Sequence, residues 1–233
     1  MQTDEAIHLP NHLGLILDGN RRWAKKHNLP SAEGHRQGYK TLKKIALKAF
    51  DMGIPYISVY IFSTENWQRS KDEVEYLMKL LVWISKNEVK AYEKENIRIV
   101  IAGMKEGLSS EVSEALSSIE KRTAANTKGT LILCFNYGGQ QEIVDAAKKL
   151  LRERSDPASL TTKSFEKYLY APDIPPIDLL VRTSGEYRLS GFMLWRAAYA
   201  ELAFVDALWP DFSQQDLQTV LRYYAARQRR FGS

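Results

Sequence analysis

The sequence predicts an α/β fold: a single domain with one six-stranded, mostly parallel sheet flanked by helices on both faces. Apolar runs of strand length alternate along the chain with longer segments whose apolar residues recur at helical spacing. Turn residues or polar clusters separate the two kinds of segment, and no internal repeat or low-complexity tract interrupts them. A chain of 233 residues fits one large domain, so we expect the domain to span residues 1–233.

The first half of the chain is predicted to form three strands and three helices. Each strand is an apolar run, and each helix carries apolar residues three and four positions apart, as with Leu42, Ile45 and Ala49. Gly53 ends the first of these helices. The predicted strands cover residues 13–17, 54–62 and 97–102, and the predicted helices cover 36–52, 72–95 and 109–126.

The second half continues the alternation. The predicted strands cover 130–135, 177–181 and 203–205, and the predicted helices cover 140–152 and 165–169. Ser213 and Asp216 form a capping-box pattern that predicts a last helix, with a basic end at Arg229 and Arg230. The stretch 192–201 is too mixed to assign.

Composition places the chain among soluble globular proteins, with 44% hydrophobic and 26% charged residues. Cys134 is the one cysteine and lies in an apolar run, so we expect a core residue, with no disulfide and no cysteine-based metal site. An export signal is absent, and no apolar run approaches about 18 residues. These features predict a cytoplasmic protein, at most peripheral at a membrane.

A net charge of +5 and an isoelectric point near 9.1 raise the question of an acidic partner. Nucleic acid, an anionic membrane surface and phosphorylated small molecules are the candidates, and the positions of the arginines must decide between them.

Asp18 follows the first strand and is an oxygen ligand suited to Mg²⁺, while Gly19 lets the backbone approach a ligand closely. Arg21 and Arg22 carry guanidinium forks that match phosphate oxygens. This cluster predicts a magnesium-bound diphosphate, with a solvated Asp-Gly turn as the alternative.

Two later strands also end in polar clusters, at residues 63–69 and 182–190. The carboxyl ends of parallel strands share one edge of a sheet, where ligands of open α/β sheets bind, so we expect the three clusters to meet. Five arginines, few acids and indole rings at one edge fit substrates that are anionic at one end and apolar beyond.

Motifs for several competing chemistries are absent: the Rossmann fingerprint, the GxSxG elbow of lipases and a zinc-type histidine pair on a helix. The stretch GHRQGYKT at 34–41 misses the P-loop spacing, and we interpret its glycines as a turn before a helix. His35 opens that helix, where its ring N–H is placed to donate to a phosphate.

Several motifs, in order and at matching spacing, resemble the cis-prenyltransferase family, whose best-known member is undecaprenyl diphosphate synthase. They are LILDGNRRWA, GHRQGY, FSTENWQR, FNYGGQQEIV, LLVRTSGEYRLSGFMLWRAAYAE, LWPDF and the closing RRFG. The resemblance covers about residues 13–232 and implies an undecaprenyl diphosphate synthase-like fold. It implies that isopentenyl diphosphate is added repeatedly, in cis, to an allylic diphosphate starter, usually farnesyl diphosphate, to make a Z-polyprenyl diphosphate of the undecaprenyl lipid-carrier type.

The resemblance also implies residue roles. Asp18 and Glu201 match the ligands of a Mg²⁺ cofactor, and Asp18 and Asn66 match catalytic positions. Because a neutral amide is a poor base, we expect Asn66 to position the substrate while a diphosphate oxygen accepts the proton. The matched substrate-binding positions are Gly19, Asn20, Arg21, Arg22, Trp23, Ser31, His35, Ser63, Thr64, Glu65, Trp67, Arg69, Arg182, Arg188, Leu189 and Ser190.

The chain departs from the family pattern at several positions. Ser31 stands where the family usually has an arginine that contacts the allylic diphosphate, and Ser184, Tyr187 and Gly191 replace a glycine, a histidine and an asparagine. Ile61 is bulkier than the small residue of some long-chain members, which favours a shorter product. These departures put the starter and the product length in question.

The growing chain needs an apolar tunnel, since each five-carbon unit gains roughly 3–4 kcal/mol on burial at about 0.8 kcal/mol per CH₂. The helix over 72–95, with Leu77, Leu81 and Ile84 on one face, is the expected wall, with core packing as the alternative. The RRFG ending matches a motif that reaches a neighbouring subunit's site, so we expect a homodimer, with peripheral membrane contact for product release.

Two other functions stay open from the sequence. A noncatalytic partner subunit of a heteromeric prenyltransferase would look degraded at the aspartate motif, where Asp18 is intact. A basic nucleic-acid-binding protein would spread its arginines along one face instead of gathering them at strand ends. We therefore expect a prenyltransferase that does not bind nucleic acid.

Overall fold

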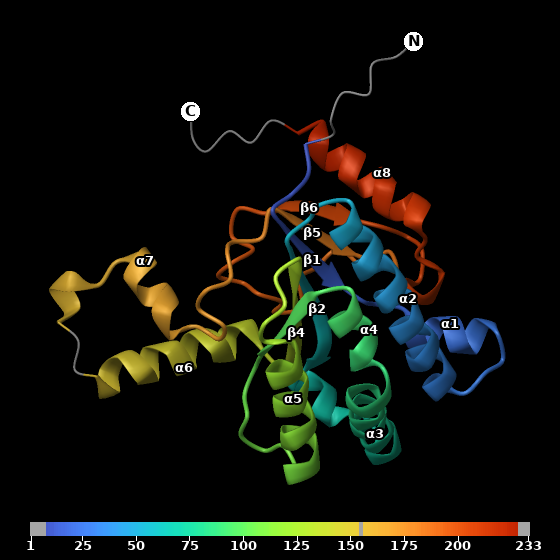
Figure 1. The fold of residues 1–233 in the computed structure, drawn as a ribbon, viewed down its shortest axis with the longest axis horizontal. Helices are drawn as coiled ribbons and strands as arrows, with labels where there is room; N and C mark the ends of the chain where they lie inside the picture. Colours follow the sequence, from blue (N-terminus) through green and yellow to red (C-terminus); the bar gives the residue numbers. More distant parts are fainter. Residues whose placement is uncertain (1–7, 154–155, 228–233) are drawn as a thin grey trace.

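The computed structural model describes residues 8–153 and 156–227, and it confirms the predicted six-stranded sheet (Figure 1). Neighbouring strands lie in the order β3-β4-β2-β1-β5-β6, and all the pairings are parallel. The strands are β1 (His12–Ile16), β2 (Tyr56–Ser63), β3 (Ile97–Ala102), β4 (Gly129–Tyr137), β5 (Leu179–Arg182) and β6 (Glu201–Phe204). Every strand therefore ends at the same edge of the sheet.

Helices and short 3₁₀ turns connect the strands. The α-helices are α1 (Asn20–Lys26), α2 (Ser31–Asp51), α3 (Lys71–Asn87), α4 (Val89–Lys94), α5 (Ser110–Thr123), α6 (Gly139–Arg152), α7 (Thr162–Phe165) and α8 (Gln214–Ala225). The 3₁₀ turns are η1 (Thr64–Gln68), η2 (Pro157–Ser159), η3 (Glu166–Tyr168) and η4 (Trp209–Asp211). The stretch 192–201, which the sequence left unassigned, forms turns until β6 begins.

The helix starts follow their capping residues. Ser70, Ser109 and Ser213 each accept a backbone N–H of the first turn, and the predicted capping box of Ser213 with Asp216 is present. The predicted helix over 72–95 is wrong as one piece, because it divides into α3 and α4 at Glu88. The Glu88 carboxylate accepts from Lys43 Nζ at 2.7 Å and from Tyr39 Oη at 3.3 Å, which ties the break to α2.

The core lies on both faces of the sheet. One face packs against α2, α4, α5 and α8. The other packs against Phe192, Met193, Ile174 and Ile177, which lie in irregular segments, so the prediction of helices on both faces is only partly right. A third cluster joins α3 and α5 to the ends of β2 and β4. Cys134 is buried in the second cluster, as predicted.

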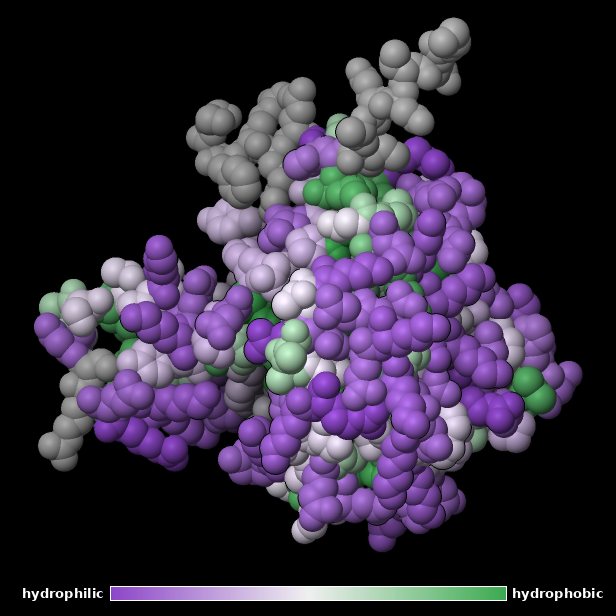
Figure 2. Space-filling model, viewed as in Figure 1, coloured by the Kyte–Doolittle hydropathy of each residue, from purple (hydrophilic) through white to green (hydrophobic). Residues whose placement is uncertain are grey.

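An arm formed by α6 and α7 projects from the sheet at the left of Figure 1. It exposes Val144, Leu151 and Leu160, and Figure 2 shows hydrophobic side chains among hydrophilic ones there. Across residues 8–153 and 156–227, no helix has the length and apolarity needed to cross a bilayer. The RRFG ending and the expected basic end of the last helix lie outside the described residues.

Candidate active site

The three polar clusters meet where β2, β1 and β5 end side by side. From β1 the chain crosses to β2 on one side, whereas β5 leads to β6 on the other, so the strand order reverses between β1 and β5. Such a reversal opens a crevice at the carboxyl edge of a parallel sheet, which is the usual ligand position in these folds. Asp18 and Arg182 face each other across this crevice, with Asp18 Oδ2 and Arg182 Nη2 2.8 Å apart.

The turn after β1 fixes the position of Asp18. Gly19 has a φ of +112°, and a Cβ there would lie 3.0 Å from Leu208. The Asp18 carbonyl accepts from Thr183 Oγ1 at 2.7 Å and from the Trp209 N–H at 2.9 Å. Burial acts to raise the pKa of Asp18, but the hydrogen bond and charge of Arg182 and the charge of Arg22 hold it below its ordinary value. Asp18 is therefore ionised at neutral pH.

Arg182 is a buried, pre-positioned cation. Its side chain is 4% exposed, and Nη1 donates to Arg188 O at 2.6 Å and to Ser190 Oγ at 2.8 Å. Its Nε has no partner. A buried donor without a partner is rare in proteins, and this one lies at the crevice. The same guanidinium thus holds the loop that carries Arg188 and Ser190 against Asp18.

Arg22 lies on the opposite side of Asp18. It donates to both the backbone oxygen and the hydroxyl of Ser184, and lies 3.4 Å from Asp18 Oδ1 and 3.4 Å from Glu186 Oε1. Ser184, one of the departures from the family pattern, has a φ of +81° and so takes a conformation more usual for glycine. Arg188 is exposed and contacts Glu186 at 2.5 Å. Arg22 and Arg188 therefore share one acid, which a more negative ligand can displace.

The glycines of GHRQGY serve helix packing, so the prediction of a turn there is wrong. Gly34 and Gly38 lie on one side of α2, and a Cβ on them would come within 2.1 Å of the Asn20 backbone oxygen and 2.2 Å of Asn20 Oδ1. The start of α1 thus packs directly on α2. Asn20 Oδ1 is buried without a partner, and it and Arg182 Nε are the two such side-chain atoms among the described residues.

Glu73, a residue that the sequence reasoning missed, organises the basic groups beyond Asn20. Its carboxylate accepts from Arg69 Nη1 at 2.8 Å, lies 3.2 Å from His35 Nε2 and lies 3.8 Å from Arg21 Nη1. Burial acts to raise the pKa of Glu73, but these three neighbours hold it below its usual value. Burial lowers the pKa of His35 against the opposing effect of Glu73. The spacing of Arg69 and Glu73 at the start of a helix was the available signal.

Two cavities meet at this edge of the sheet. One holds about 270 Å³, and part of its wall is apolar, formed by Ile61, Leu42, Leu77, Leu80 and Ile84. The other holds about 730 Å³ and is mostly basic, with walls that include Arg21, Arg22, Lys25, Ser31 and Arg69. Both cavities share Leu17, Asp18, Asn20, His35 and Arg69. The site therefore joins a basic cavity and a cavity with an apolar wall at Asp18. Leu77 and Ile84 of α3 line that wall as expected, whereas Leu81 packs in the third core cluster, which was the alternative.

The polar cluster at residues 63–69 is brought to the apolar cavity in part. Ser63 and Asn66 line it, and Asn66 Oδ1 accepts the Ser63 N–H at 3.2 Å. Thr64 and Glu65 hydrogen-bond to each other on η1, and Trp67 donates to Asn136 Oδ1 at 2.7 Å.

Other predicted residues have partners outside the two cavities. Trp23 donates to Asp211 Oδ1 at 2.6 Å, and Leu189 packs against the second core cluster. These contacts give both residues structural roles beside the site.

Glu201 does not lie beside Asp18 within one chain, and the prediction that the two residues hold one Mg²⁺ stays a prediction. Glu201 begins β6 and pairs with Leu179, whereas Arg182, beside Asp18, pairs with Phe204. Glu201 therefore lies three residues before the position on β6 that pairs with Arg182, a distance of about 10 Å along the strand. Glu201 instead lies 3.7 Å from Arg227, which follows the last helix.

The donor set at the crevice nevertheless suits one kind of metal ion. No group of three or more His, Cys, Asp or Glu side chains within the described ranges could hold an ion by itself. Mg²⁺ is usually bound through one or two carboxylates together with substrate phosphates and water, without a full protein cage. Asp18, partly exposed and ionised between two arginines, fits that pattern.

The fold and the site define a class of protein: an α/β chain with a basic crevice at the carboxyl edge of a parallel sheet and an apolar cavity beside it. Residues 16–232 match a family model described as putative undecaprenyl diphosphate synthase. The isoprenyl transferase of Thermotoga maritima is 44% identical over 228 residues, which cover 97% of this chain and 98% of that protein. The chain belongs to this prenyltransferase family.

Other relatives show the same relationship. The trans,polycis-polyprenyl diphosphate synthase ((2Z,6E)-farnesyl diphosphate specific) of Thermobifida fusca is 43% identical, over 96% of this chain and 81% of that protein. The crystal structure of lavandulyl diphosphate synthase from Lavandula x intermedia in complex with dimethylallyl diphosphate matches with a TM-score of 0.92 at 34% identity, covering 99% of this chain and 100% of that one. The crystal structure of a probable undecaprenyl diphosphate synthase from Campylobacter jejuni matches with a TM-score of 0.81 at 29% identity. The match covers 97% of this chain and 99% of that one.

Proposed function

We propose that the protein is a Mg²⁺-dependent Z-polyprenyl diphosphate synthase that adds isopentenyl diphosphate repeatedly to an allylic diphosphate starter. The observation that carries this proposal is the junction of a basic and an apolar cavity at Asp18, which matches a substrate that is anionic at one end and apolar at the other. We propose farnesyl diphosphate as the starter and an undecaprenyl-type lipid carrier precursor as the product. A farnesyl diphosphate is named for the Thermobifida fusca relative, and the Lavandula structure holds dimethylallyl diphosphate.

The chemistry requires stabilisation of a leaving diphosphate. Breaking the allylic carbon–oxygen bond leaves a delocalised cation and places extra negative charge on the diphosphate. Arg22 is already held by Ser184, so it meets that charge without reorganisation. Mg²⁺, held at Asp18 with the diphosphate, would neutralise further charge when bound. Arg21 and Lys25 line the same chamber and supplement the positive charge where Ser31 offers none.

The second substrate is proposed to bind at Arg182, Arg188 and Ser190. Arg182 fixes the loop through Arg188 O and Ser190 Oγ, and the Arg188 side chain is free to exchange Glu186 for a phosphate. The double bond of isopentenyl diphosphate attacks the allylic cation and forms the new carbon–carbon bond, and the resulting cation then loses a proton to an oxygen of the released diphosphate. We assign Asn66 a positioning role, because its Oδ1 is held by the Ser63 N–H and a neutral amide is a weak base.

A homodimer is the proposed assembly. The arm of α6 and α7 exposes Val144, Leu151 and Leu160, with Leu151 73% exposed, and the surface near β6 exposes Tyr199 and Leu202. Exposed apolar side chains in such numbers on one projecting element are typical of a subunit interface. Sedimentation of the full chain tests this assembly directly, and a monomer at micromolar concentration would contradict it.

The proposed activity is tested with purified protein alone. The chain is incubated with labelled isopentenyl diphosphate, Mg²⁺ and either dimethylallyl or farnesyl diphosphate, and the products are resolved by length. We expect polymer that depends on the starter and is abolished by a chelator. Absence of product with every starter would contradict the proposal and would favour a noncatalytic partner subunit, while retention by an oligonucleotide column would favour nucleic-acid binding.

A further inference from the structure

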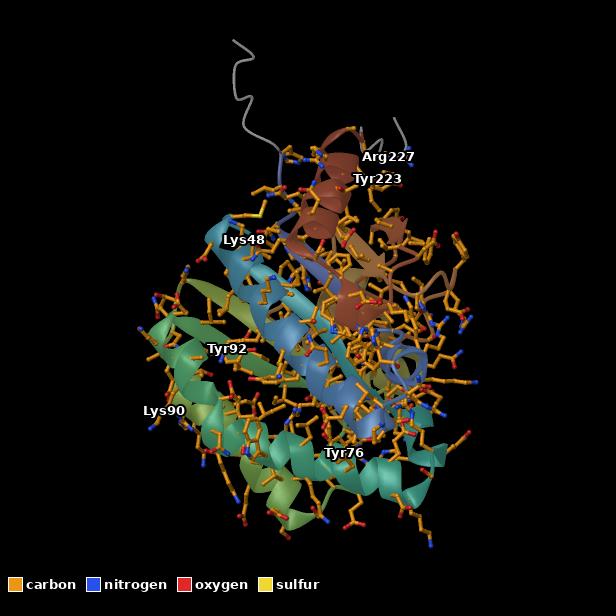
Figure 3. All side chains as sticks on the ribbon, turned by 90° about the vertical axis from the view of Figure 1, so that its right-hand side faces the viewer. Lys48, Tyr76, Lys90, Tyr92, Tyr223 and Arg227 are labelled. Carbon is orange, nitrogen blue, oxygen red and sulfur yellow. The ribbon has the colours of Figure 1, made fainter. Side chains whose placement is uncertain are left out.

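A second apolar site lies outside the two cavities of the active site. It is a groove of about 800 Å³ between the outer sides of α2 and α3, on the face turned toward the viewer in Figure 3. Leu47, Tyr76, Leu80 and Trp83 supply its apolar lining, and Trp83 is 49% exposed. Figure 3 shows Tyr76 where the lower end of α2 meets α3. We call this the α2–α3 groove.

Basic side chains surround the apolar lining. Arg36, Lys40, Lys43, Lys44 and Lys79 border the α2–α3 groove, and Glu88 is the one acid among its lining residues. Three of the five pair with an acid: Arg36 with Glu33, Lys43 with Glu88 and Lys79 with Glu75. Lys40 and Lys44 enter no ion pair within the described part of the chain and are exposed. The groove therefore keeps unpaired positive charge beside apolar surface.

A single layer of side chains separates this groove from the active site. Tyr39 and Leu80 line both the α2–α3 groove and the apolar cavity of about 270 Å³. Tyr39 is held by its hydroxyl to Glu88 at 3.3 Å, at the break between α3 and α4. Pockets for single drug-sized ligands measure about 300–1,000 Å³, so this cavity is too small to enclose a long polyprenyl chain.

We propose that the α2–α3 groove binds the surface of an anionic lipid bilayer and so places lipid beside the tunnel wall. Aromatic and aliphatic side chains in the groove enter the interfacial region, Trp83 being a residue type favoured at that depth, and Lys40 and Lys44 contact anionic headgroups. The inference deepens the proposed function, because it gives a destination to a product larger than its cavity. Leucine side chains in the floor favour lipid chains over nucleic acid.

The test measures binding of the substrate-free full chain to vesicles of phosphatidylcholine, with and without phosphatidylglycerol. The test variant combines Lys40→Gln and Lys44→Gln, and a matched variant combines Lys105→Gln and Lys121→Gln, two exposed lysines outside both the groove and the arm. Each basic residue near an anionic surface contributes about fivefold to binding, so the test variant should lose roughly 25-fold in affinity while the matched variant binds like the wild type. Trp83→Phe should retain binding but lose part of the blue shift in tryptophan emission that vesicles cause.

Several results would overturn the inference. Equal binding to neutral and anionic vesicles, or equal loss in the two lysine variants, would remove the α2–α3 groove as the lipid site. Tighter binding of a single-stranded oligonucleotide than of anionic vesicles would assign the lysines to nucleic acid. A change of oligomeric state in the Lys40→Gln, Lys44→Gln variant would assign the groove to a second copy of the chain. The vesicle experiment contains no substrate, so its result does not depend on synthase activity. A chain that binds vesicles but makes no product would contradict the proposed function and leave the lipid site standing.

Discussion

His12, buried at the amino edge of β1, makes the stability of the protein depend on pH in a way that can be calculated. Its side chain is fully buried, with Nε2 2.8 Å from Ser58 Oγ and Nδ1 2.8 Å from the Pro175 carbonyl oxygen. Burial is the main cause that lowers the pKa of His12 from 6.5 to about 4. The ring is therefore neutral in the folded protein at neutral pH, with Nδ1–H as the donor to Pro175.

This shift predicts a loss of stability on acidification. Between pH 6.5 and about 4 the unfolded chain carries a proton on His12 that the folded chain does not, so the free energy of unfolding falls as pH falls. A shift of 2.5 pKa units, the difference of the two values, corresponds to about 3 kcal/mol at 1.36 kcal/mol per unit. The loss begins near pH 6.5 and is complete below about pH 4.

Urea unfolding from pH 7.5 to pH 4 tests the calculation, with His12→Asn as the comparison. An asparagine amide can replace Nδ1–H toward Pro175 and does not titrate. We expect the stability of the wild type relative to His12→Asn to decrease by about 3 kcal/mol across this range, because other titrating groups cancel in the difference. A difference that does not change with pH, or a His12 pKa above 6 by NMR, would refute the reasoning.

Three further predictions concern the site. Asp18→Asn keeps the side-chain shape but removes the charge between the arginines, so it should lower the rate of product formation by roughly 100-fold or more in a radiolabel assay. The thermal unfolding midpoint checks that the variant folds. A rate within threefold of the wild type would contradict this prediction. Gly38→Ala places a Cβ 2.2 Å from Asn20 Oδ1, so it should lower both the thermal midpoint and the affinity for the allylic starter, and an unchanged KM would argue against Asn20 as a substrate contact. Glu73→Gln removes the carboxylate that raises the pKa of His35, so NMR titration should find that pKa lower still, and an unchanged value would show that Glu73 does not act on His35.

The sheet and the meeting of its polar clusters could be predicted from the sequence. Strand-length apolar runs alternating with helical patterns require parallel strands, and parallel strands bring their ends to one edge. Asp18, Ser63 and Arg182 each follow or end one of these strands and are therefore predicted to lie together, and the structure confirms that they line one cavity.

What the sequence could not predict depends on packing between distant segments. Gly34 and Gly38 are interpreted as a turn because nothing in the neighbouring sequence explains two glycines inside a helix. The structure explains them by the close approach of Asn20, from α1, to this side of α2. Glu73 becomes a site residue only because α2 and α3 lie side by side. Glu201 follows a motif that resembles a metal-binding one, but its place in the register of β6 puts it at the wrong edge for Asp18 in the same chain.

The arrangement of Arg182 explains why this crevice suits a diphosphate instead of a neutral ligand. A buried charge is stable only when it is paired and hydrogen-bonded, and Arg182 has one carboxylate, Asp18, and two neutral oxygens on its terminal nitrogens. Asp18 also interacts with Arg22, so one acid faces two guanidinium groups at the crevice, and Arg182 Nε is still without an acceptor. An anion in the crevice would supply the missing negative charge. The protein thus holds its cations in place before the substrate arrives, which is the condition under which charge on a leaving diphosphate is stabilised most strongly.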